Sequence, residues 1–241
     1  MKTERTEVHR HPERACYDRE TIHRIIDEAL ICHIAIVQDG QPFILPVIHT
    51  RIDERLYIHG SRGSRLLQAL AIGTPACISM TIVDGLVLAK SAMHHSMNYR
   101  SVMVLGRGRA VEDEHTKGIV WGALVEHVVP GRSNDCRMPN AQESKATMLI
   151  EFPIEEASAK IRTGGPKDDA ADLLLPHWAG VLSLELAAGE AVSAESTAHN
   201  REGPNYLLSY SRRRSQPAST FALPREADST SPTSTATRPA K

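Results

Sequence analysis

The chain has 241 residues, of which 41% are hydrophobic, so it is long enough for one large domain or two small ones and can bury a real core. Its 28 Lys and Arg residues nearly balance its 29 Asp and Glu residues, and the formal net charge is −1. The net charge is therefore too small to favour binding to nucleic acid, to a membrane surface or to an acidic partner. Any anion-binding site must depend on a local group of basic residues.

The four cysteines are scattered along the chain without a CxxC pair. This spacing fits reduced intracellular thiols better than a disulfide framework or a zinc site. The N-terminus is polar, and no apolar run of about 18 residues follows it. We therefore expect a cytoplasmic protein with no membrane partner and no nucleic-acid partner.

The first half of the chain predicts a meander with one helix before it. Residues 1–16 read as a polar N-terminal arm, and Asp18 or Thr21 is expected to cap a one-faced helix that reaches Ala29. Strands are expected at 30–37, 41–50 and 55–60, joined by the turns at Asp39-Gly40 and Asp53-Glu54. Three consecutive antiparallel strands are typical of the beginning of a β-barrel or a β-sandwich and not of a βαβ fold.

The second half predicts more strands, two helices and a tail. Helices are expected at 64–72 and 114–129, and strands at 76–81, 86–89, 97–112, 147–152 and 157–162. From about residue 190 the chain is rich in Ser, Thr, Pro and Arg, and it has too few large apolar residues to offset its ordering entropy. We therefore expect one domain over 17–190 and a disordered tail over 191–241.

A small-residue turn joins the expected 55–60 strand to the expected 64–72 helix. Its sequence is Gly60-Ser61-Arg62-Gly63-Ser64, and Ser64 stands where a helix N-cap belongs. Hydroxyls, glycines that permit close approach, and Arg62 and Arg65 would surround the free N–H groups of the helix start, which is the chemistry of a phosphate cradle. An ordinary strand-to-helix turn with solvated arginines is the alternative.

A second stretch lies at 96–109. Strand alternation places Ser96, Asn98 and Arg100 on one face, and Ser101 on the other, before a buried apolar run at 102–105.

In order, HGSRGSR at 59–65 and NYRSVMVLG at 98–106 resemble the pyridoxamine 5′-phosphate oxidase-like flavin-binding split barrels. The most similar branch contains the nitroimidazole reductase-type flavin-nucleotide-binding proteins. The resemblance runs from about residue 11 to 186 and includes DGQPF at 39–43, KAT at 145–147, AKIRTG at 159–164 and WAGV at 178–181.

This resemblance implies a mainly β fold, a six-stranded antiparallel Greek-key split barrel with peripheral helices. It also implies a homodimer with FMN in a groove at the subunit interface. The implied activity is that of an FMN-dependent oxidoreductase that reduces a small electron-poor organic substrate with electrons from NAD(P)H. A pyridoxal 5′-phosphate-producing oxidase is disfavoured, because that enzyme's substrate-phosphate residues and basic C-terminal end are not matched.

The resemblance also carries a set of cofactor-binding residues. Ser61, Ser64 and Arg65 would hold the FMN phosphate from the turn, and Arg100 and Ser101 would add donors from the neighbouring strand. His59 would line the ribityl or phosphate region, or else be a barrel-lining histidine bonded to backbone. The remaining candidates are Phe43, Pro46, Val47 and Trp178 for the flavin ring, Gly60 for close approach, and Asn98 and Lys145.

No side chain stands out as a general acid or base, and no nucleophile constellation of a hydrolase is recognisable. His94 and His95 are neighbours on an extended chain and point in opposite directions, so no metal site is predicted there. Two other functions remain open. One is a non-enzymatic flavin carrier or sensor, and the other is a haem-binding split barrel, since some members of this superfamily bind haem through a histidine.

Overall fold

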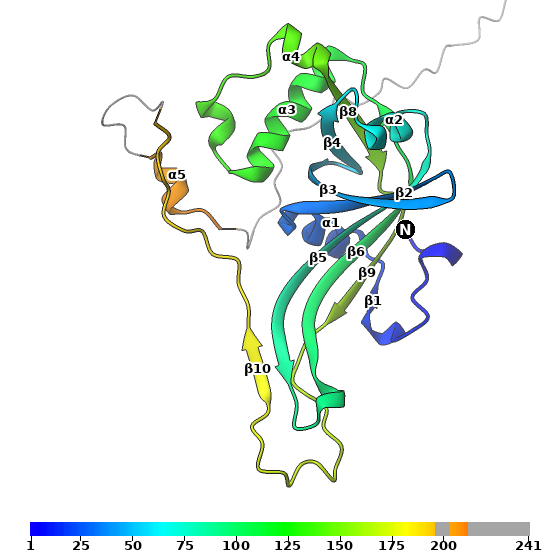
Figure 1. Cartoon of the computed structure of the whole chain (residues 1–241), viewed down its shortest axis with the longest axis vertical. Coiled ribbons are helices and arrows are strands. Elements are labelled where there is room, and N and C mark those ends of the chain that lie inside the picture. The colour runs from blue at the N-terminus through cyan, green and yellow to red at the C-terminus, as the bar shows by residue number, and fades with distance from the viewer. Residues whose placement is uncertain (196–202, 212–241) are drawn as a thin grey trace, which may run out of the picture.

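Antiparallel strands dominate the structure, a computed structural model that describes residues 1–195 and 203–211 (Figure 1). Ten strands of the described residues form one sheet in the order β1-β9-β6-β5-β2-β3-β4-β8-β7, and β10 pairs with β5. The strands are β1 (Ala15–Cys16), β2 (Ile31–Gln38), β3 (Gln41–Ile52), β4 (Arg55–Ser61), β5 (Pro75–Leu88), β6 (Ser96–Arg107), β7 (Arg109–Ala110), β8 (Thr147–Pro153), β9 (Glu156–Arg162) and β10 (Gly180–Ser183).

Five α-helices of the described residues lie around this sheet: α1 (Arg19–Glu28), α2 (Arg65–Ala71), α3 (Glu114–Val128), α4 (Ala141–Ala146) and α5 (Asn205–Leu208). The expected mainly β split barrel with peripheral helices is confirmed, with ten strands in place of six. None of these helices is both long and apolar enough to span a membrane.

The long strand β3 connects the two halves of the barrel. A tight turn leads into it, with Asp39 at φ 53° and Gly40 at φ 76°, the left-handed pair that two-residue hairpins require. The first half of β3 pairs with β2, and its second half, from His49 to Ile52, pairs with β4. The strands therefore form two connected halves that curve around a shared interior.

The main core fills that interior. Asp18 caps α1 by accepting from the Thr21 N–H at 2.8 Å, and the helix buries an isoleucine face against β3, β5, β6 and β9. A second cluster lies between α3 and the β3–β4 pair, around Tyr57. Figure 1 shows α3 on this side of the sheet, above the long strands.

Several expected elements differ in detail. The strands expected at 76–81 and 86–89 are one strand, β5, with an irregularity between Val83 and Gly85. The strand expected at 97–112 divides at Gly108, where an added Cβ would lie 2.7 Å from Ile150 Cγ2, so only glycine permits this close approach. The short elements α4 and β10 were not predicted.

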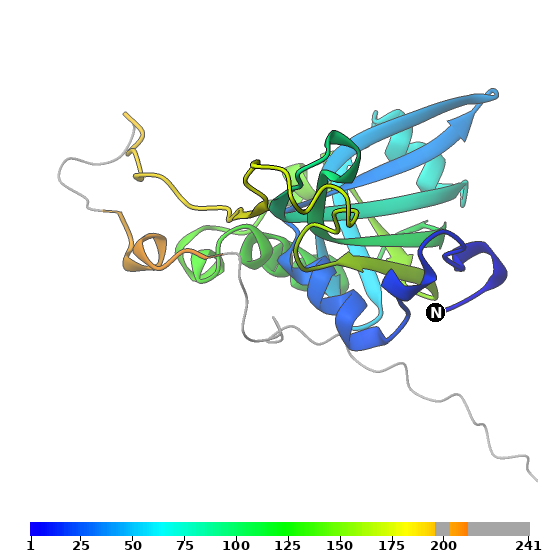
Figure 2. The same ribbon diagram turned by 90° about the horizontal axis from the view of Figure 1, so that it is seen from below.

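Both ends of the domain make contacts that the sequence did not indicate. Residues 1–16 pack on β9: Thr3 and Arg5 bind the Glu156 carboxylate, and β1 pairs with β9. In the expected tail, the Tyr206 hydroxyl of α5 donates to Asp135 at 2.9 Å. Figure 2 shows α5, in orange, beside the green segment that follows α3. Within the tail expected at 191–241, residues 203–211 are described and contain α5, while 196–202 and 212–241 lie outside the described residues.

Candidate functional site

The turn between β4 and α2 has the predicted form. Strand β4 ends at Ser61, and α2 begins at Arg65. The Ser64 hydroxyl accepts from the Leu67 N–H at 3.5 Å, as an N-cap should, and the Ser61 hydroxyl accepts from the Gly63 N–H at 3.2 Å. Both hydroxyls therefore lie on one short turn at the protein surface.

Arg65 projects from this turn onto the ring of Phe43. Its guanidinium carbon lies 3.9 Å from the ring centroid, a cation–π contact between α2 and β3. In the described residues the Arg65 side chain has no hydrogen bond and no ion pair, and it is exposed. Its five N–H donors are held in position by stacking and remain available to an anion.

Lys145 comes to the same turn from far along the chain. The Arg62 side chain donates from Nε to the Lys145 carbonyl at 2.7 Å, and the Arg62 N–H donates to the Ala146 carbonyl at 3.3 Å. Gly60 has a packing function here, because an added Cβ would lie 3.3 Å from Leu67 Cδ1 of α2. The structure thus gathers Gly60, Ser61, Ser64, Arg65, Phe43 and Lys145 at one edge of the barrel.

The β3 residues expected to face a flavin ring do not share one face. Phe43 and Val47 pack partly against the main core. Pro46 lies opposite His33 of β2, is exposed, and points to the other side of the strand. A flat ligand therefore cannot contact all three from one side within a single chain.

His59 lies on the side of β4 that faces α3. Its ring centroid is 5.0 Å from that of Trp121 in an edge-on arrangement, with 63° between the planes. Its Nδ1 is buried and has no hydrogen-bond partner among the described residues. Burial lowers the pKa of the His59 imidazole, so the neutral ring is favoured. Among the residues that the structure describes, no backbone group binds the His59 ring, in contrast to the alternative of a histidine bonded to backbone.

Arg100 does not belong to the turn, which corrects the expectation that it adds donors to the phosphate. Its guanidinium binds Glu28 at 2.5 and 2.8 Å and Asp84 at 2.8 and 2.6 Å. These carboxylates line a pocket of about 310 Å³ between the end of α1, β5 and residues 184–186. Ser101 is on the opposite face, where its hydroxyl donates to the Lys160 carbonyl at 3.2 Å.

Two further candidates lie apart from the turn. Asn98 accepts from Arg162 at 2.5 Å, an interaction within the β6–β9 pair. Trp178 is 68% exposed and precedes β10, which Figure 1 shows at the opposite end of the sheet from α2. Within one chain, neither residue reaches Arg65.

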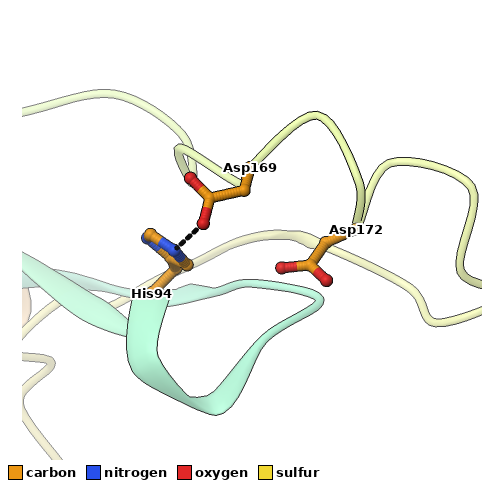
Figure 3. A group of neighbouring side chains, drawn as sticks. All are labelled: His94, Asp169 and Asp172. Carbon is orange, nitrogen blue, oxygen red and sulfur yellow. Dashed lines mark hydrogen bonds and ion pairs between the residues drawn. The ribbon is translucent and has the colours of Figure 1, made fainter.

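His94 belongs to a group that the sequence did not indicate. Its Nε2 lies 3.3 Å from a carboxylate oxygen of Asp169, and Asp172 approaches from the same loop (Figure 3). The ligand atoms of the three residues lie within 4.8 Å of one another. His95 turns away and its Nδ1 contacts the Ser91 carbonyl at 3.0 Å. Exposed acidic groups of this kind are common without an ion, so we assign it no function.

Three residues of these sites were missed by sequence reasoning. Glu28 and Asp84 become partners of Arg100 only through the tertiary fold, and no local pattern marks them. Trp121 could have been singled out from the sequence, because the chain contains only 2 tryptophans and this one lies on the helix predicted at 114–129.

The chain is similar to proteins of known family and known structure. The family model for pyridoxamine 5′-phosphate oxidase matches residues 18–161. The flavocytochrome Anf3 from Azotobacter vinelandii has 35% identity over 86% of this chain and 97% of its own, with a TM-score of 0.80. The FAD and haem binding protein from Mycobacterium smegmatis has 32% identity over 82% of this chain and 97% of its own, with a TM-score of 0.78.

A third structure shares the fold alone. It is described as a 5-nitroimidazole antibiotic resistance protein from Bacteroides thetaiotaomicron, and it has 20% identity over 61% of this chain and 86% of its own, with a TM-score of 0.52. No curated protein sequence matches the chain.

Proposed function

Because the chain belongs to the pyridoxamine 5′-phosphate oxidase family, we propose that it is a flavin-dependent oxidoreductase that also binds haem. The observation that carries this proposal is similarity over 86% and 82% of the chain to a flavocytochrome and to an FAD and haem binding protein. Because a fold alone does not imply a function, the chain's own residues must also fit these groups.

The turn between β4 and α2 fits the phosphate of a flavin nucleotide. A phosphate needs several donors held together, and the turn supplies the Ser61 and Ser64 hydroxyls beside the unpaired guanidinium of Arg65. Stacking on Phe43 restricts the Arg65 side chain before the ligand arrives, which lowers the entropic cost of binding. The backbone carbonyl of Lys145 binds Arg62 at the same edge, and the Lys145 side chain would add a second positive charge.

The proposed flavin is FAD in place of the FMN predicted from the sequence. The support is the similarity to the FAD and haem binding protein, at 32% identity. Both nucleotides contain the phosphate that Arg65 would bind, so the residues of the turn serve either one. Identification of the released flavin by mass spectrometry distinguishes them.

An apolar face supports the proposed homodimer. Ile31, Ile44 and Ile48 lie on the outer face of the β2–β3 pair and are 41%, 65% and 37% exposed. Neighbouring exposed apolar side chains of this kind mark interaction sites. A partner chain would also supply the second wall that the flavin ring lacks, because Pro46 and Phe43 face opposite sides of β3 within one chain.

When bound, the flavin supplies two-electron chemistry and the haem supplies one-electron chemistry. The protein residues hold and orient these groups. We propose NAD(P)H as the electron source, a small molecule as the acceptor, and the cytoplasm as the location.

The test is the absorption spectrum of the purified protein, followed by identification of the extracted cofactors. Flavin bands and a Soret band together, with flavin reduction on addition of NADH or NADPH, are the expected result. A protein that binds no flavin after reconstitution with FAD or FMN would contradict the proposal. Bound flavin that neither nicotinamide reduces would favour the non-enzymatic carrier.

A further inference from the structure

The cavity of about 310 Å³ lies where one side of strand β5 has a gap in its pairing. Strand β2 pairs with the Ala76–Ser79 segment of β5, and β10 pairs with its Gly85–Leu88 segment. Because β6 pairs along the other side of β5, the Thr81–Val83 segment between them has no partner strand on this side among the described residues. An open strand edge of this kind offers N–H and C=O groups to an extended segment.

The lining of this cavity is both acidic and apolar. It includes Glu28, Asp84 and Glu185, and none of the described lysines or arginines belongs to it. Arg100 binds each of the first two carboxylates with two hydrogen bonds, but a carboxylate has about four acceptor positions, so one arginine does not saturate it. The apolar part of the lining includes Ile31, Ile82, Leu184 and Leu186. The cavity therefore suits a cation with an apolar stem, which is the character of an arginine side chain.

The chain itself brings arginines to this cavity. Ser211 belongs to the lining, and the residues that follow it are Arg212-Arg213-Arg214. Three residues span at most roughly 11 Å, so all three side chains begin close to the cavity. Helix α5 anchors the preceding segment, because the Tyr206 hydroxyl donates to Asp135 and accepts from Arg132.

We propose that the segment Arg212-Arg213-Arg214 docks in this cavity and binds its carboxylates as an intramolecular ligand. Charge complementarity and the position of Ser211 identify this segment as the occupant. Because the segment is attached at the cavity, its effective concentration is in the millimolar range or above, and individually weak ion pairs are sufficient. The docked segment covers the open edge of β5 between β2 and β10. The inference is independent of the proposed cofactors.

The test is hydrogen–deuterium exchange on the full chain, which reports the local protection of backbone amides. The wild type is compared with the triple variant Arg212→Ser, Arg213→Ser and Arg214→Ser. The matched control, Arg225→Ser with Arg238→Ser, removes arginines farther along the chain. Peptides from the cavity lining of β5 and of residues 184–186 should exchange at least tenfold faster in the triple variant, while β8 is unchanged. The control should match the wild type, and about 0.5 M salt should remove the protection from the wild type.

A second triple variant, Arg212→Lys, Arg213→Lys and Arg214→Lys, keeps the positive charge and should restore most of the protection. Unchanged exchange of the cavity lining in the Ser variant would overturn the proposal. So would an equal acceleration in β8, because it would reveal a global loss of stability and no local docking. Protection that falls when the wild type is diluted would mean that a second copy supplies the segment, which would overturn intramolecular docking.

Discussion

His49 and His127 lie with their ring centroids 4.6 Å apart, and each contacts a carbonyl at the C-terminal end of α1. The His49 Nε2 is 2.9 Å from the Ile26 oxygen, and the His127 Nε2 is 2.9 Å from the Ala29 oxygen. Since a carbonyl only accepts, both rings donate from Nε2. The last carbonyls of a helix lack partners within the helix, so two buried histidines from β3 and α3 complete the end of α1.

Loss of one of these donors should destabilise the protein. In His127→Ala the Ala29 carbonyl loses this buried donor and a cavity forms, so we expect the free energy of unfolding to fall by about 2–4 kcal/mol. Urea denaturation followed by circular dichroism measures this loss. His127→Gln retains an N–H donor and should recover part of it, and equal stability of both variants with the wild type would show that the bond contributes nothing.

Arg65→Ala should weaken flavin binding selectively. The lost charge-assisted contact is worth about 1.5–3 kcal/mol, which corresponds to roughly tenfold to a hundredfold weaker binding of FMN. Riboflavin lacks the phosphate, so its affinity should hardly change. Fluorescence titration of the apo-protein with both ligands makes the comparison, and equal losses for the two ligands would mean that the turn does not bind phosphate.

Arg100→Ala should affect stability rather than the flavin affinity. The change leaves the carboxylates of Glu28 and Asp84, 12% and 26% exposed, without the arginine that binds both. Breaking a buried ion pair costs up to about 3–5 kcal/mol, so the melting temperature should fall clearly. Arg100→Lys retains the charge but not the planar geometry and should be intermediate. Weaker flavin binding at unchanged stability would instead support the phosphate role expected from the sequence.

Cys32 should react slowly with alkylating reagents. Burial raises the pKa of the Cys32 thiol to about 12, and the thiolate is the reactive form. At pH 8 native protein should therefore be labelled by iodoacetamide at the partly exposed Cys136 well before Cys32, as peptide mass spectrometry would show. In guanidinium chloride both should react alike. Rapid labelling of Cys32 in the native state would mean that β2 opens readily.

Local signals were sufficient for the elements that depend on neighbouring residues. Asp18 caps α1, Asp39-Gly40 makes the hairpin, and Ser64 begins α2, all as predicted, because capping and turn chemistry act within a few residues. The family was also recognisable from ordered short stretches.

Interactions over long sequence separations were not predictable in the same way. The partners of Arg100 are 72 and 16 residues away, and the contact between Arg62 and Lys145 spans 83 residues. The helix α5 falls in a segment without apolar periodicity, and its Tyr206 hydroxyl accepts from Arg132 and donates to Asp135. Composition alone cannot show such contacts, because they depend on where the fold brings the chain.

The first residues of the chain protect an edge of the sheet. Strand β9 is followed in the sheet only by the two-residue β1, while the Met1 carbonyl accepts from the Ala157 N–H at 3.0 Å and Thr3 and Arg5 bind Glu156. An uncovered edge strand exposes N–H and C=O groups that can pair with another molecule. A protein shortened at this end would therefore be prone to open-ended, strand-by-strand aggregation in concentrated solution.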